Sequence, residues 1–565
     1  MHKKILFSIL LSRAEGMVRG FNRATQQVAE VQREVLLNKV RPHADSDFGR
    51  RFGFRGITDV ARFRESVPIA DYALYHPYIE EVKKGKLGAM FGRGTRLVMF
   101  AMTSGTTREP KYIPVTREFL NDYRRGWLVW GWHVYRSYPS IINRTIFPLT
   151  SAYDEQYTGT GLPCGAISGL TSEKQNLVTR MIYTAPSCLY RVKNIDAKYY
   201  AMMRFALMRD VGSITTANPS TVLSIVRLAD KRKDDLIRDI RDGGIGASVD
   251  LPSDVREYCR RRLPPAPARA AELERFAGSR GELLPRDYWP GLQVITNWKG
   301  GTLSSYLEQY PHYFGETPVR DIGLVASEGR MSIPLSDEGC GGVLDVTSHF
   351  YEFIPEDEED SRDPAVLLAH ELEEGKRYFI LLTTSCGLYR YNIRDLVEVT
   401  GRYHHAPVIR FLNKGKHISS ITGEKLTEFQ VVEAMREAGR ACAMPIDTFT
   451  AVPERSAVPG YALIVEQIAA GNVDARRRLC AEFDAALRRM NIEYDGKRAS
   501  GRLAMPAVLT VRDGSFEDMK RRHIEKQKGR AEQYKHIFLV PDGDFLNECA
   551  IIERVSAGAL RGSGV

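Results

Sequence analysis

Short apolar runs alternate with segments of helical periodicity over roughly the first 400 residues of the chain. The strand-like runs lie at residues 95–102, 111–116, 144–150, 292–298, 320–327 and 375–385. Helical patterns separate several of them, at residues 117–138, 198–209 and 219–241. Strands that alternate with helices bury their apolar faces best as a parallel sheet covered by helices. This pattern therefore predicts an α/β domain built on a mostly parallel sheet.

The pattern changes after residue 413. Residues 427–440 and 474–491 have helical periodicity, and the strand-like runs between and after them are short. Such an alternation over residues 414–565 predicts a smaller α+β domain. A chain of 565 residues is long enough for more than one folding unit. We therefore expect a large α/β domain with mixed sheets at residues 1–413 and a small C-terminal α+β domain at residues 414–565.

The N-terminus, MHKKILFSILLSRAEG, partly resembles a signal peptide. Two lysines precede its apolar stretch, but no small-residue cleavage site follows cleanly, and the helical pattern continues to residue 41. We expect a first helix there. No apolar run approaches the roughly 18 residues of a membrane span. The sequence predicts a cytoplasmic protein that does not act at a membrane.

Charge and cysteine content exclude several classes of protein. The net charge is +10, and the basic runs are short and lie in charge-mixed helical patterns, which favours solvated helix faces over a nucleic-acid surface. The eight cysteines include no CxxC pair, and the two nearest, Cys164 and Cys188, are 24 residues apart. That spacing indicates neither a zinc ribbon nor a disulfide framework. We expect reduced thiols, no nucleic-acid partner, and a monomer or weak oligomer.

A polar loop follows the strand-like run at residues 95–102. It reads TSGTTREPK and contains Ser104, Gly105, Thr106, Thr107 and Lys111. Hydroxyl groups, unobstructed backbone amides and a nearby lysine suit a phosphate group, and glycine allows close approach. The loop is not the GxxxxGK[ST] pattern, so P-loop mechanics do not apply. By itself, the loop is either a phosphate cradle or an ordinary turn.

Two acidic positions interrupt strand-like segments further along the chain. Ser327 and Glu328 end the run LVASEG, where a carboxylate could hold Mg²⁺, an ion that needs few protein ligands, or could simply cap the next turn. Asp395, in YRYNIRDLVEV, could accept hydrogen bonds from the two vicinal hydroxyls of a ribose. It could equally form a surface pair with Arg390 or Arg394, which would contribute little to stability.

Two lysines of the smaller predicted domain lie between predicted secondary-structure elements. Lys425 lies in ITGEKLTE, just after the expected domain boundary, and Lys535 lies in AEQYKHIFL, between a helix and a strand. Isolated lysines at such places are usually exposed to solvent. Neither one indicates a catalytic role by itself.

The order and spacing of these motifs resemble the Gretchen Hagen family of acyl-acid amido synthetases, first known from auxin-responsive plant genes. That family belongs to the acyl-adenylate-forming superfamily. The resemblance covers nearly the whole chain, and the ordered set is far more specific than any one motif. The segments that carry it are VPIADYALYHPYIEEVKKGK, TSGTTREPKYIP, DVREYCRRRLPP, YWPGLQVITNWKGGTLSSY, VASEG, YRYNIRDLVEVTGRYHHAPVIRF, GEKLTE and GSFEDMKRRHIEKQKGRAEQYK.

The resemblance implies a role for each candidate residue. It places Ser104 to Thr107 on the phosphates of ATP with Lys111 nearby, and Ser327 and Glu328 near the adenylate and Mg²⁺, with Glu328 as the metal-binding residue. It places Asp395 on the ribose hydroxyls. It implies two catalytic lysines on the small domain: Lys425, which approaches the nucleotide or the carboxylate, and Lys535, which neutralises the α-phosphate.

The implied activity is an ATP-dependent ligase that joins a carboxylic acid to an amine, such as an amino acid, through an acyl-AMP. The small domain is implied to rotate between the two half-reactions. Two alternatives stay open. The acceptor could be a thiol, as in acyl-CoA synthetases. The chain could also be a non-catalytic relative that binds a nucleotide. The presence of Lys535, Asp395 and Glu328 argues against this second alternative.

Two positions depart from the family pattern. Lys414 stands where the hinge usually carries an arginine, and arginine and lysine are not interchangeable at a bidentate site. The plant members continue Lys-x-Pro-Arg after the catalytic lysine, whereas this chain continues KHIF from Lys535. Such departures fit a divergent, bacterial branch and do not support a plant-hormone substrate.

Overall fold

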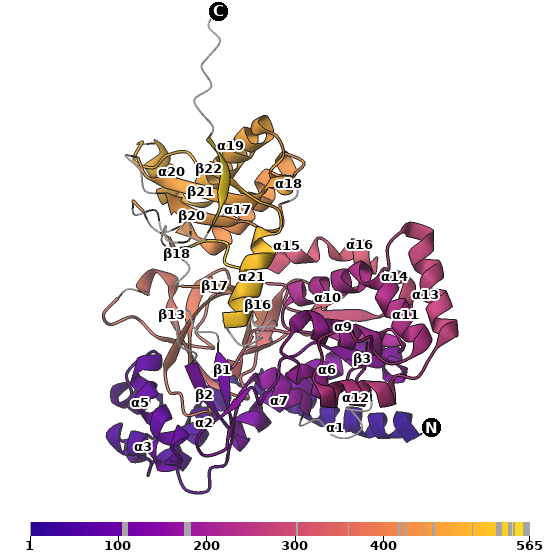
Figure 1. Ribbon diagram of the computed structural model, residues 1–565. Coiled ribbons are helices and arrows are strands. Elements are labelled where there is room, and N and C mark those ends of the chain that lie inside the picture. The colour runs from indigo at the N-terminus through magenta and orange to yellow at the C-terminus, as the bar shows by residue number, and fades with distance from the viewer. Residues whose placement is uncertain are drawn as a thin grey trace, which may run out of the picture. The chain divides into compact units, whose positions relative to one another are not determined.

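The computed structural model describes residues 2–103, 111–173, 182–300, 303–359, 361–415, 418–419, 421–422, 424, 426–444, 446–454, 458–499, 501–526, 534–540, 545 and 549–556. The chain divides into two compact units. The larger unit comprises residues up to Leu303 together with Leu307–Phe411, and most of the smaller unit follows from Leu412. Figure 1 shows the elements of both units.

The N-terminal part of the larger unit is helical. Its helices are α1 (His2–Ala24), α2 (Val28–Val40), α3 (Asp47–Arg51), α4 (Val60–Ser66) and α5 (Tyr72–Lys83). The expected continuous helix to residue 41 is wrong, because the helix breaks after Ala24. The carbonyl of Thr25 accepts a hydrogen bond from the amide of His405 at 2.9 Å, and this long-range contact takes the place of a helical one.

One sheet of the larger unit is entirely parallel. Its strands, in the order β3-β6-β7-β8, are β3 (Thr145–Pro148), β6 (Val211–Thr215), β7 (Val294–Asn297) and β8 (Val319–Asp321). The helices of this region, which are labelled in Figure 1, are α9 (Ile195–Ala206), α10 (Pro219–Lys231), α11 (Lys233–Asp242), α12 (Ser253–Arg262), α13 (Pro267–Arg280), α14 (Pro285–Tyr288) and α16 (Tyr310–Phe314). The predicted helix at residues 219–241 divides at Arg232, which leaves the helical conformation.

A second sheet contains the two strands on either side of the polar loop. Its order is β2-β1-β5-β4, from β1 (Leu97–Thr103), β2 (Lys111–Thr116), β4 (Gln156–Tyr157) and β5 (Pro163–Gly165). β1 and β2 are antiparallel, and β1 pairs in parallel with β5. Thr116 caps helix α6 (Arg117–Ser137) by accepting a hydrogen bond from the amide of Phe119. Helix α7 (Ile167–Glu173) follows β5. The two predicted strands at residues 95–102 and 111–116 and the helix after them are confirmed.

The third sheet has seven strands. Their order is β11-β12-β17-β16-β15-β13-β14, from β11 (Ser332–Ile333), β12 (Gly341–Leu344), β13 (Phe350–Pro355), β14 (Leu367–Leu368), β15 (Arg377–Thr383), β16 (Tyr391–Tyr403) and β17 (Ala406–Lys414). β15 pairs antiparallel with both β13 and β16. A mostly parallel sheet is therefore a correct prediction for one sheet only, and the larger unit as a whole has mixed sheets, as its predicted fold class states.

The smaller unit is a helix-covered sheet with the order β20-β21-β22-β23. The strands of this sheet are β20 (Thr450–Glu454), β21 (Gly460–Glu466), β22 (Ala507–Val511) and β23 (Ile551–Ser556). Two further strands, β18 (Ile418–Ser419) and β19 (Leu426–Thr427), pair with each other in a separate sheet. The helices of the smaller unit are α17 (Glu428–Ala441), α18 (Gln467–Ala470), α19 (Val473–Met490), α20 (Ile492–Ala499) and α21 (Ser515–Lys526). Leu463 and Phe483 are fully buried between the sheet and α17 and α19. The predicted α+β character of this region is confirmed.

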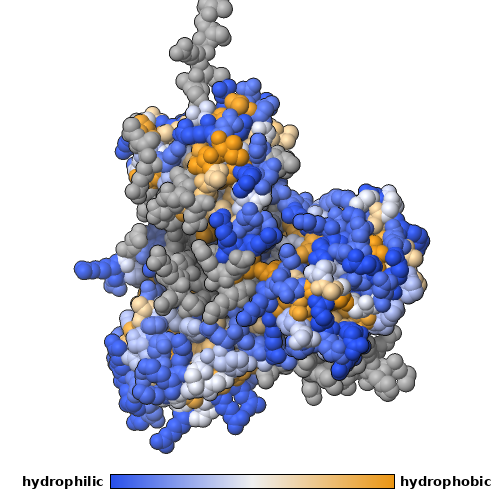
Figure 2. All heavy atoms as spheres, viewed as in Figure 1, coloured by the Kyte–Doolittle hydropathy of each residue, from blue (hydrophilic) through white to orange (hydrophobic). Residues whose placement is uncertain are grey.

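Hydrophilic residues predominate on the face shown in Figure 2, and hydrophobic ones form scattered patches. In the part of the chain that the structure describes, no helix combines the length and the apolar character needed to cross a bilayer.

Candidate active site

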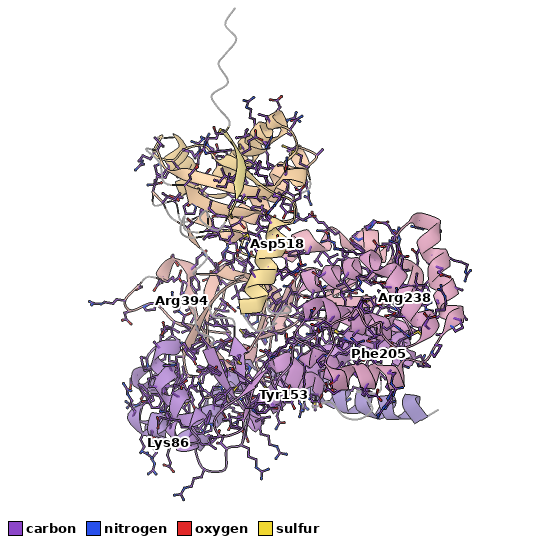
Figure 3. The ribbon with its side chains drawn as sticks, viewed as in Figure 1. Lys86, Tyr153, Phe205, Arg238, Arg394 and Asp518 are labelled. Carbon is purple, nitrogen blue, oxygen red and sulfur yellow. The ribbon has the colours of Figure 1, made fainter. Side chains whose placement is uncertain are left out.

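Asp395 lies on β16 at an irregularity in the seven-stranded sheet. Phe379 of β15 pairs with Leu396 and Leu381 pairs with Asn392, so residues 393–395 face one residue of the partner strand. Arg394, labelled in Figure 3, takes a left-handed conformation with φ 59°, and its amide donates to Oδ1 of Asn392 at 2.8 Å. A bulge of this kind changes the direction of the side chains that it carries. The Asp395 side chain is 3% exposed.

Because Asp395 is buried, it does not form the surface ion pair that was one alternative for its role. A surface pair with Arg390 or Arg394 requires an exposed carboxylate, which Asp395 does not have. The Arg390 guanidinium instead donates through Nε to Oε2 of Glu352 at 2.9 Å and through Nη1 to the carbonyl of Val67 at 2.8 Å. Asp395 is therefore held inside the larger unit.

Ser327 and Glu328 form the two-residue turn between β9 (Val325–Ala326) and β10 (Gly329–Arg330). Glu328 is 6% exposed. The backbone of Gly329, just after this turn, packs closely against His349, because a Cβ atom there would lie 2.8 Å from Nε2. The Cys386 thiol donates to the Glu328 carbonyl at 3.9 Å.

Tyr391, the first residue of β16, interacts with residues from several of these motifs. Burial raises the pKa of its hydroxyl, and the carboxylate of Glu328 raises it further, with smaller contributions from Tyr72, Asp71 and Asp395. Nζ of Lys111 lies 3.5 Å from the Tyr391 hydroxyl. Tyr391 thus contacts Lys111 and shares β16 with Asp395, and the charges of Glu328 and Asp395 both raise its pKa.

Tyr72 of α5 belongs to the same cluster. Burial raises its pKa to about 12, against the opposing effect of the backbone of Tyr112, and Glu80, Tyr112 and last Glu328 raise it slightly further. Its hydroxyl accepts from the amide of Tyr112 at 2.9 Å, and Nζ of Lys111 lies 5.4 Å from its ring centre. Sequence reasoning did not assign a role to Tyr72 or Tyr391, although both stand in the motifs quoted above. We call Lys111, Tyr72, Tyr391, Glu328 and Asp395 the tyrosine-centred cluster.

Of the remaining predicted site residues, the structure does not describe five. Ser104, Gly105, Thr106, Thr107 and Lys425 fall outside the described residues. Lys535 belongs to the smaller unit, and its side chain is exposed. Next to Lys425, the buried Glu424 accepts from the amide of Ile421 at 2.7 Å and from that of Thr422 at 2.8 Å.

The aromatic residues of α6 differ in how far they are buried. Tyr123 and Trp130 are buried, whereas Trp127 and Trp132 are partly buried. The Arg330 guanidinium lies 4.3 Å from the Trp127 ring centre and donates through Nη2 to the Ile322 carbonyl at 2.7 Å. Sequence reasoning missed this buried arginine, since one basic residue in a strand-like run indicates nothing specific.

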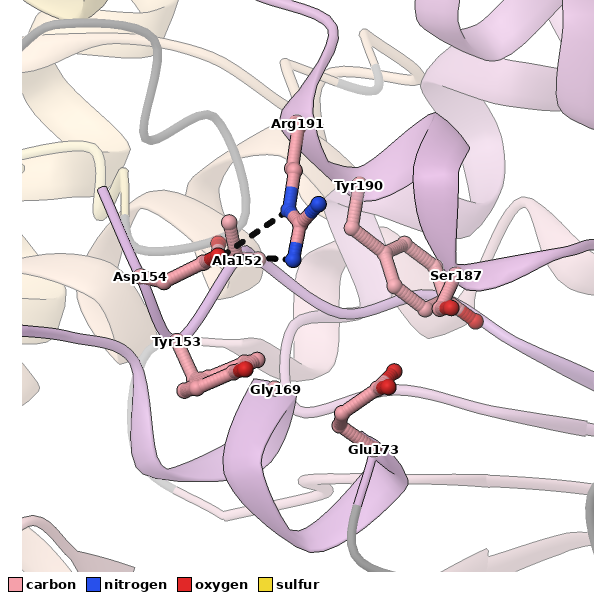
Figure 4. A pocket seen from close by; sticks show the side chains of 9 residues that line it. Ala152, Tyr153, Asp154, Gly169, Glu173, Ser187, Tyr190 and Arg191 are labelled. Atoms are coloured by element: carbon pink, nitrogen blue, oxygen red, sulfur yellow. Dashed lines mark hydrogen bonds and ion pairs between the residues drawn. The ribbon is translucent and has the colours of Figure 1, made fainter. Parts of the chain in front are cut away.

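A small pocket lies between α7, the preceding loop and the 3₁₀ helix Ser187–Arg191 (Figure 4). Arg191 closes one side through an ion pair with Asp154 at 2.8 Å. The space suffices for about one water molecule, so this pocket is not a substrate site.

A mixed α/β unit followed in sequence by a small α+β unit is the domain order that the resemblance to the acyl-adenylate-forming fold implies. Residues 17–319 match the GH3 family N-terminal domain, residues 342–414 its central domain and residues 429–544 its C-terminal domain. The chain belongs to the GH3 family.

Curated relatives agree with this assignment over nearly their whole length. A jasmonoyl-L-amino acid synthetase, GH3.5 of Oryza sativa subsp. japonica, is 24% identical over 92% of this chain and 94% of its own. An indole-3-acetic acid-amido synthetase, GH3.8 of Oryza sativa subsp. indica, is 26% identical over 89% of this chain and 87% of its own.

Solved structures show the same fold. The GH3.15 acyl acid amido synthetase superposes with a TM-score of 0.83 at 20% identity, covering 96% of each chain. A second structure, AtGH3.15 in complex with 2,4-DB, also gives 0.83 at 19% identity, covering 96% of this chain and 97% of that one. The predicted family and the predicted acyl-adenylate-forming fold are confirmed, and the predicted class of enzyme is that of these relatives.

Proposed function

We propose that the protein is an ATP-dependent acid–amine ligase. It activates a carboxylic acid as an acyl-AMP and then transfers the acyl group to an amine, which we take to be an amino acid. The observation that carries the proposal is that three parts of the chain match the GH3 family in order, while Lys111 contacts Tyr391 and the carboxylates of Glu328 and Asp395 are buried in the same unit.

The chemistry takes place in two steps. A carboxylate oxygen attacks the α-phosphorus of ATP, the bond to the β-phosphate oxygen breaks, and pyrophosphate leaves. The amine nitrogen then attacks the acyl carbon, loses its proton, and AMP departs with the electron pair of the broken C–O bond. Both reactants of the first step are anionic, so cationic groups must offset the charge that redistributes in the transition state.

The donor set of the larger unit suits a nucleotide with Mg²⁺. Asp395 is a buried carboxylate of the kind that accepts from two ribose hydroxyls, and Glu328 supplies one carboxylate oxygen at a fixed turn. Mg²⁺ keeps several waters and needs only one or two protein carboxylates. When bound, it would neutralise phosphate charge. Lys111 adds a cation beside Tyr391, and Ser104 to Thr107 would contact the phosphates from the loop between β1 and β2.

The smaller unit supplies the lysines in this proposal. Lys535 neutralises the α-phosphate during adenylation, and Lys425 approaches the nucleotide or the carboxylate. Residues 414–565 move as a body between the two half-reactions, while residues 1–413 hold the adenylate. A cytoplasmic monomer or weak oligomer fits this role, because ATP and amino acids are both abundant in the cytoplasm.

Exchange of labelled pyrophosphate into ATP tests the first step. We expect acid-dependent exchange across a panel of aromatic, fatty and hydroxy acids, and AMP release that depends on added amine. Failure of every acid would overturn adenylation. Release of AMP in response to coenzyme A but to no amine would replace the amide product with a thioester.

A further inference from the structure

The residue after Lys535 is a histidine that is held on both ring nitrogens. Nε2 of His536 lies 2.8 Å from the carbonyl oxygen of Phe449. A carbonyl only accepts, so Nε2 carries the proton. Burial lowers the pKa of His536 to about 4, so the ring is neutral near pH 7 and its Nδ1 accepts. The donor to Nδ1 is then the Tyr534 hydroxyl, at 3.2 Å.

Aromatic packing restrains the same ring. The His536 ring centre lies 5.2 Å from that of Phe516 on α21 and 4.7 Å from that of Phe538, both in edge-on geometry. The charged group that faces it is Lys520 of α21, which lowers the pKa of His536 further. Hydrogen bonds and packing therefore give this side chain one orientation.

The residues that follow His536 are joined to β20 like an added strand. The amide of Ala451 donates to the Phe538 carbonyl at 2.7 Å, and the amide of Val540 donates to the Ala451 carbonyl at 3.0 Å. The Thr450 hydroxyl donates to the carbonyl of Ile537 at 2.9 Å. Lys535 thus stands two residues before Ile537, where the segment with a fixed backbone begins.

Glu428, the first residue of α17, holds this segment from the other side. Its Oε1 accepts from the amide of Phe538 at 2.7 Å, and its side chain is 9% exposed. Burial raises the pKa of the carboxyl to about 7, against the opposing effects of the amides of Phe538 and Leu539 and the charge of Lys535. Glu428 thus links the capped N-terminus of α17 to the segment after Lys535.

We propose that His536 and Glu428 are positioning residues for Lys535, which set where its ammonium group stands during adenylation. The inference rests on the proposed function. No proline, whose fixed φ would stiffen the chain, stands within two residues of Lys535. The side-chain contacts of His536 and Glu428 supply the restraint instead.

Kinetics of the separate half-reactions test this proposal. His536→Phe keeps an aromatic ring but removes both nitrogens. We expect kcat for ATP–pyrophosphate exchange to fall by roughly ten- to a hundredfold, because a small displacement of a catalytic group is enough for such a loss. Aminolysis of supplied acyl-AMP, which does not require Lys535 in this mechanism, should change less than about twofold.

Conservative and control variants separate positioning from general damage. His536→Gln can place an amide N–H near the position of Nε2 and should recover most of the exchange activity. His370→Phe, at an exposed histidine of the larger unit, is the matched control. Thermal unfolding of each variant shows whether the fold is intact. Parallel loss of both half-reactions, or no rescue by glutamine, would contradict positioning.

The pH profile tests Glu428. As pH falls through about 7, the carboxylate gains a proton, accepts the Phe538 amide less strongly and loses its charge beside Lys535. We expect exchange activity of the wild type to decline below that pH, and Glu428→Gln, which cannot titrate, to lack this decline and to be slower at pH 8. Glu433→Gln on the same helix is the control.

The outcomes distinguish this inference from the proposed function. No exchange by the wild-type chain with any acid would overturn the proposed function and this inference with it. Exchange that His536→Phe and Glu428→Gln both leave unchanged would overturn positioning alone. Hydrogen exchange of the Phe538 amide gives an independent measure, since it should accelerate in Glu428→Gln and stay slow in Glu433→Gln.

Discussion

Asp395 and Lys535 are held in opposite ways. Asp395 lies near the start of a 13-residue strand in a seven-stranded sheet, 3% exposed, at a bulge with a left-handed residue beside it. Lys535 is exposed and precedes a short segment that is fixed by contacts from His536 and Glu428. One side chain is fixed by its own burial, and the other by the burial of its neighbours.

This difference fits the two proposed tasks. A carboxylate that accepts from two hydroxyls of a fixed ring gains from a rigid, dry setting, because its hydrogen bonds then need no reorganisation. A lysine that serves one half-reaction only must reach the substrate and leave it again. Rigid surroundings with an exposed ammonium group satisfy both needs. Variants at the two sites should therefore differ in which kinetic constant they change.

The largest effect is expected for Lys535→Ala. Loss of the ammonium group should lower acid-dependent ATP–pyrophosphate exchange by about 10²- to 10³-fold, as removal of a charge-stabilising group does. The aminolysis of supplied acyl-AMP should remain. Lys497→Ala, elsewhere on the smaller unit, serves as control. Equal loss of both half-reactions would show that Lys535 does not act in one step only.

Asp395→Asn should affect nucleotide binding more than turnover. The substitution keeps the size of the side chain and removes the charge that accepts the ribose hydroxyls. We expect KM for ATP to rise by about 10- to 100-fold, the range for a hydrogen bond to a charged group. Steady-state kinetics with varied ATP measure it, and Glu398→Gln on the same strand is the control. An unchanged KM with a lower kcat would contradict a ribose-binding role.

A smaller effect is expected for Tyr391→Phe. The hydroxyl lies 3.5 Å from Nζ of Lys111, and its loss removes one long hydrogen bond from the ammonium group while the ring stays packed. KM for ATP should rise about three- to tenfold. Tyr403→Phe, at the far end of the same strand, should leave it unchanged. If both variants behave alike, the tyrosine-centred cluster does not contact the nucleotide.

Local patterns predicted much of this fold. The strands on both sides of the polar loop, helices α6, α17 and α19, and the α+β character of the smaller unit all follow from apolar periodicity and capping residues. The break after Ala24 does not, because it depends on His405, far away in the sequence. For the same reason, neither the cluster around Tyr391 nor the contact of Glu428 with Phe538 could be read from spacing. The motifs named candidate residues but could not show how their neighbours hold them.

The smallest effect tests whether strain is stored beside Asp395. Arg394 has φ 59°, a conformation that costs an L-residue free energy and that glycine adopts readily. Arg394→Gly should therefore raise the free energy of unfolding of the larger unit by about 0.5–1 kcal/mol, whereas Arg394→Ala, which keeps Cβ, should not. Chemical denaturation measures the difference. If KM for ATP rises in Arg394→Gly but not in Arg394→Ala, the strained backbone directs the Asp395 carboxylate, and rigidity at this site comes from the chain itself rather than from side-chain contacts as at Lys535.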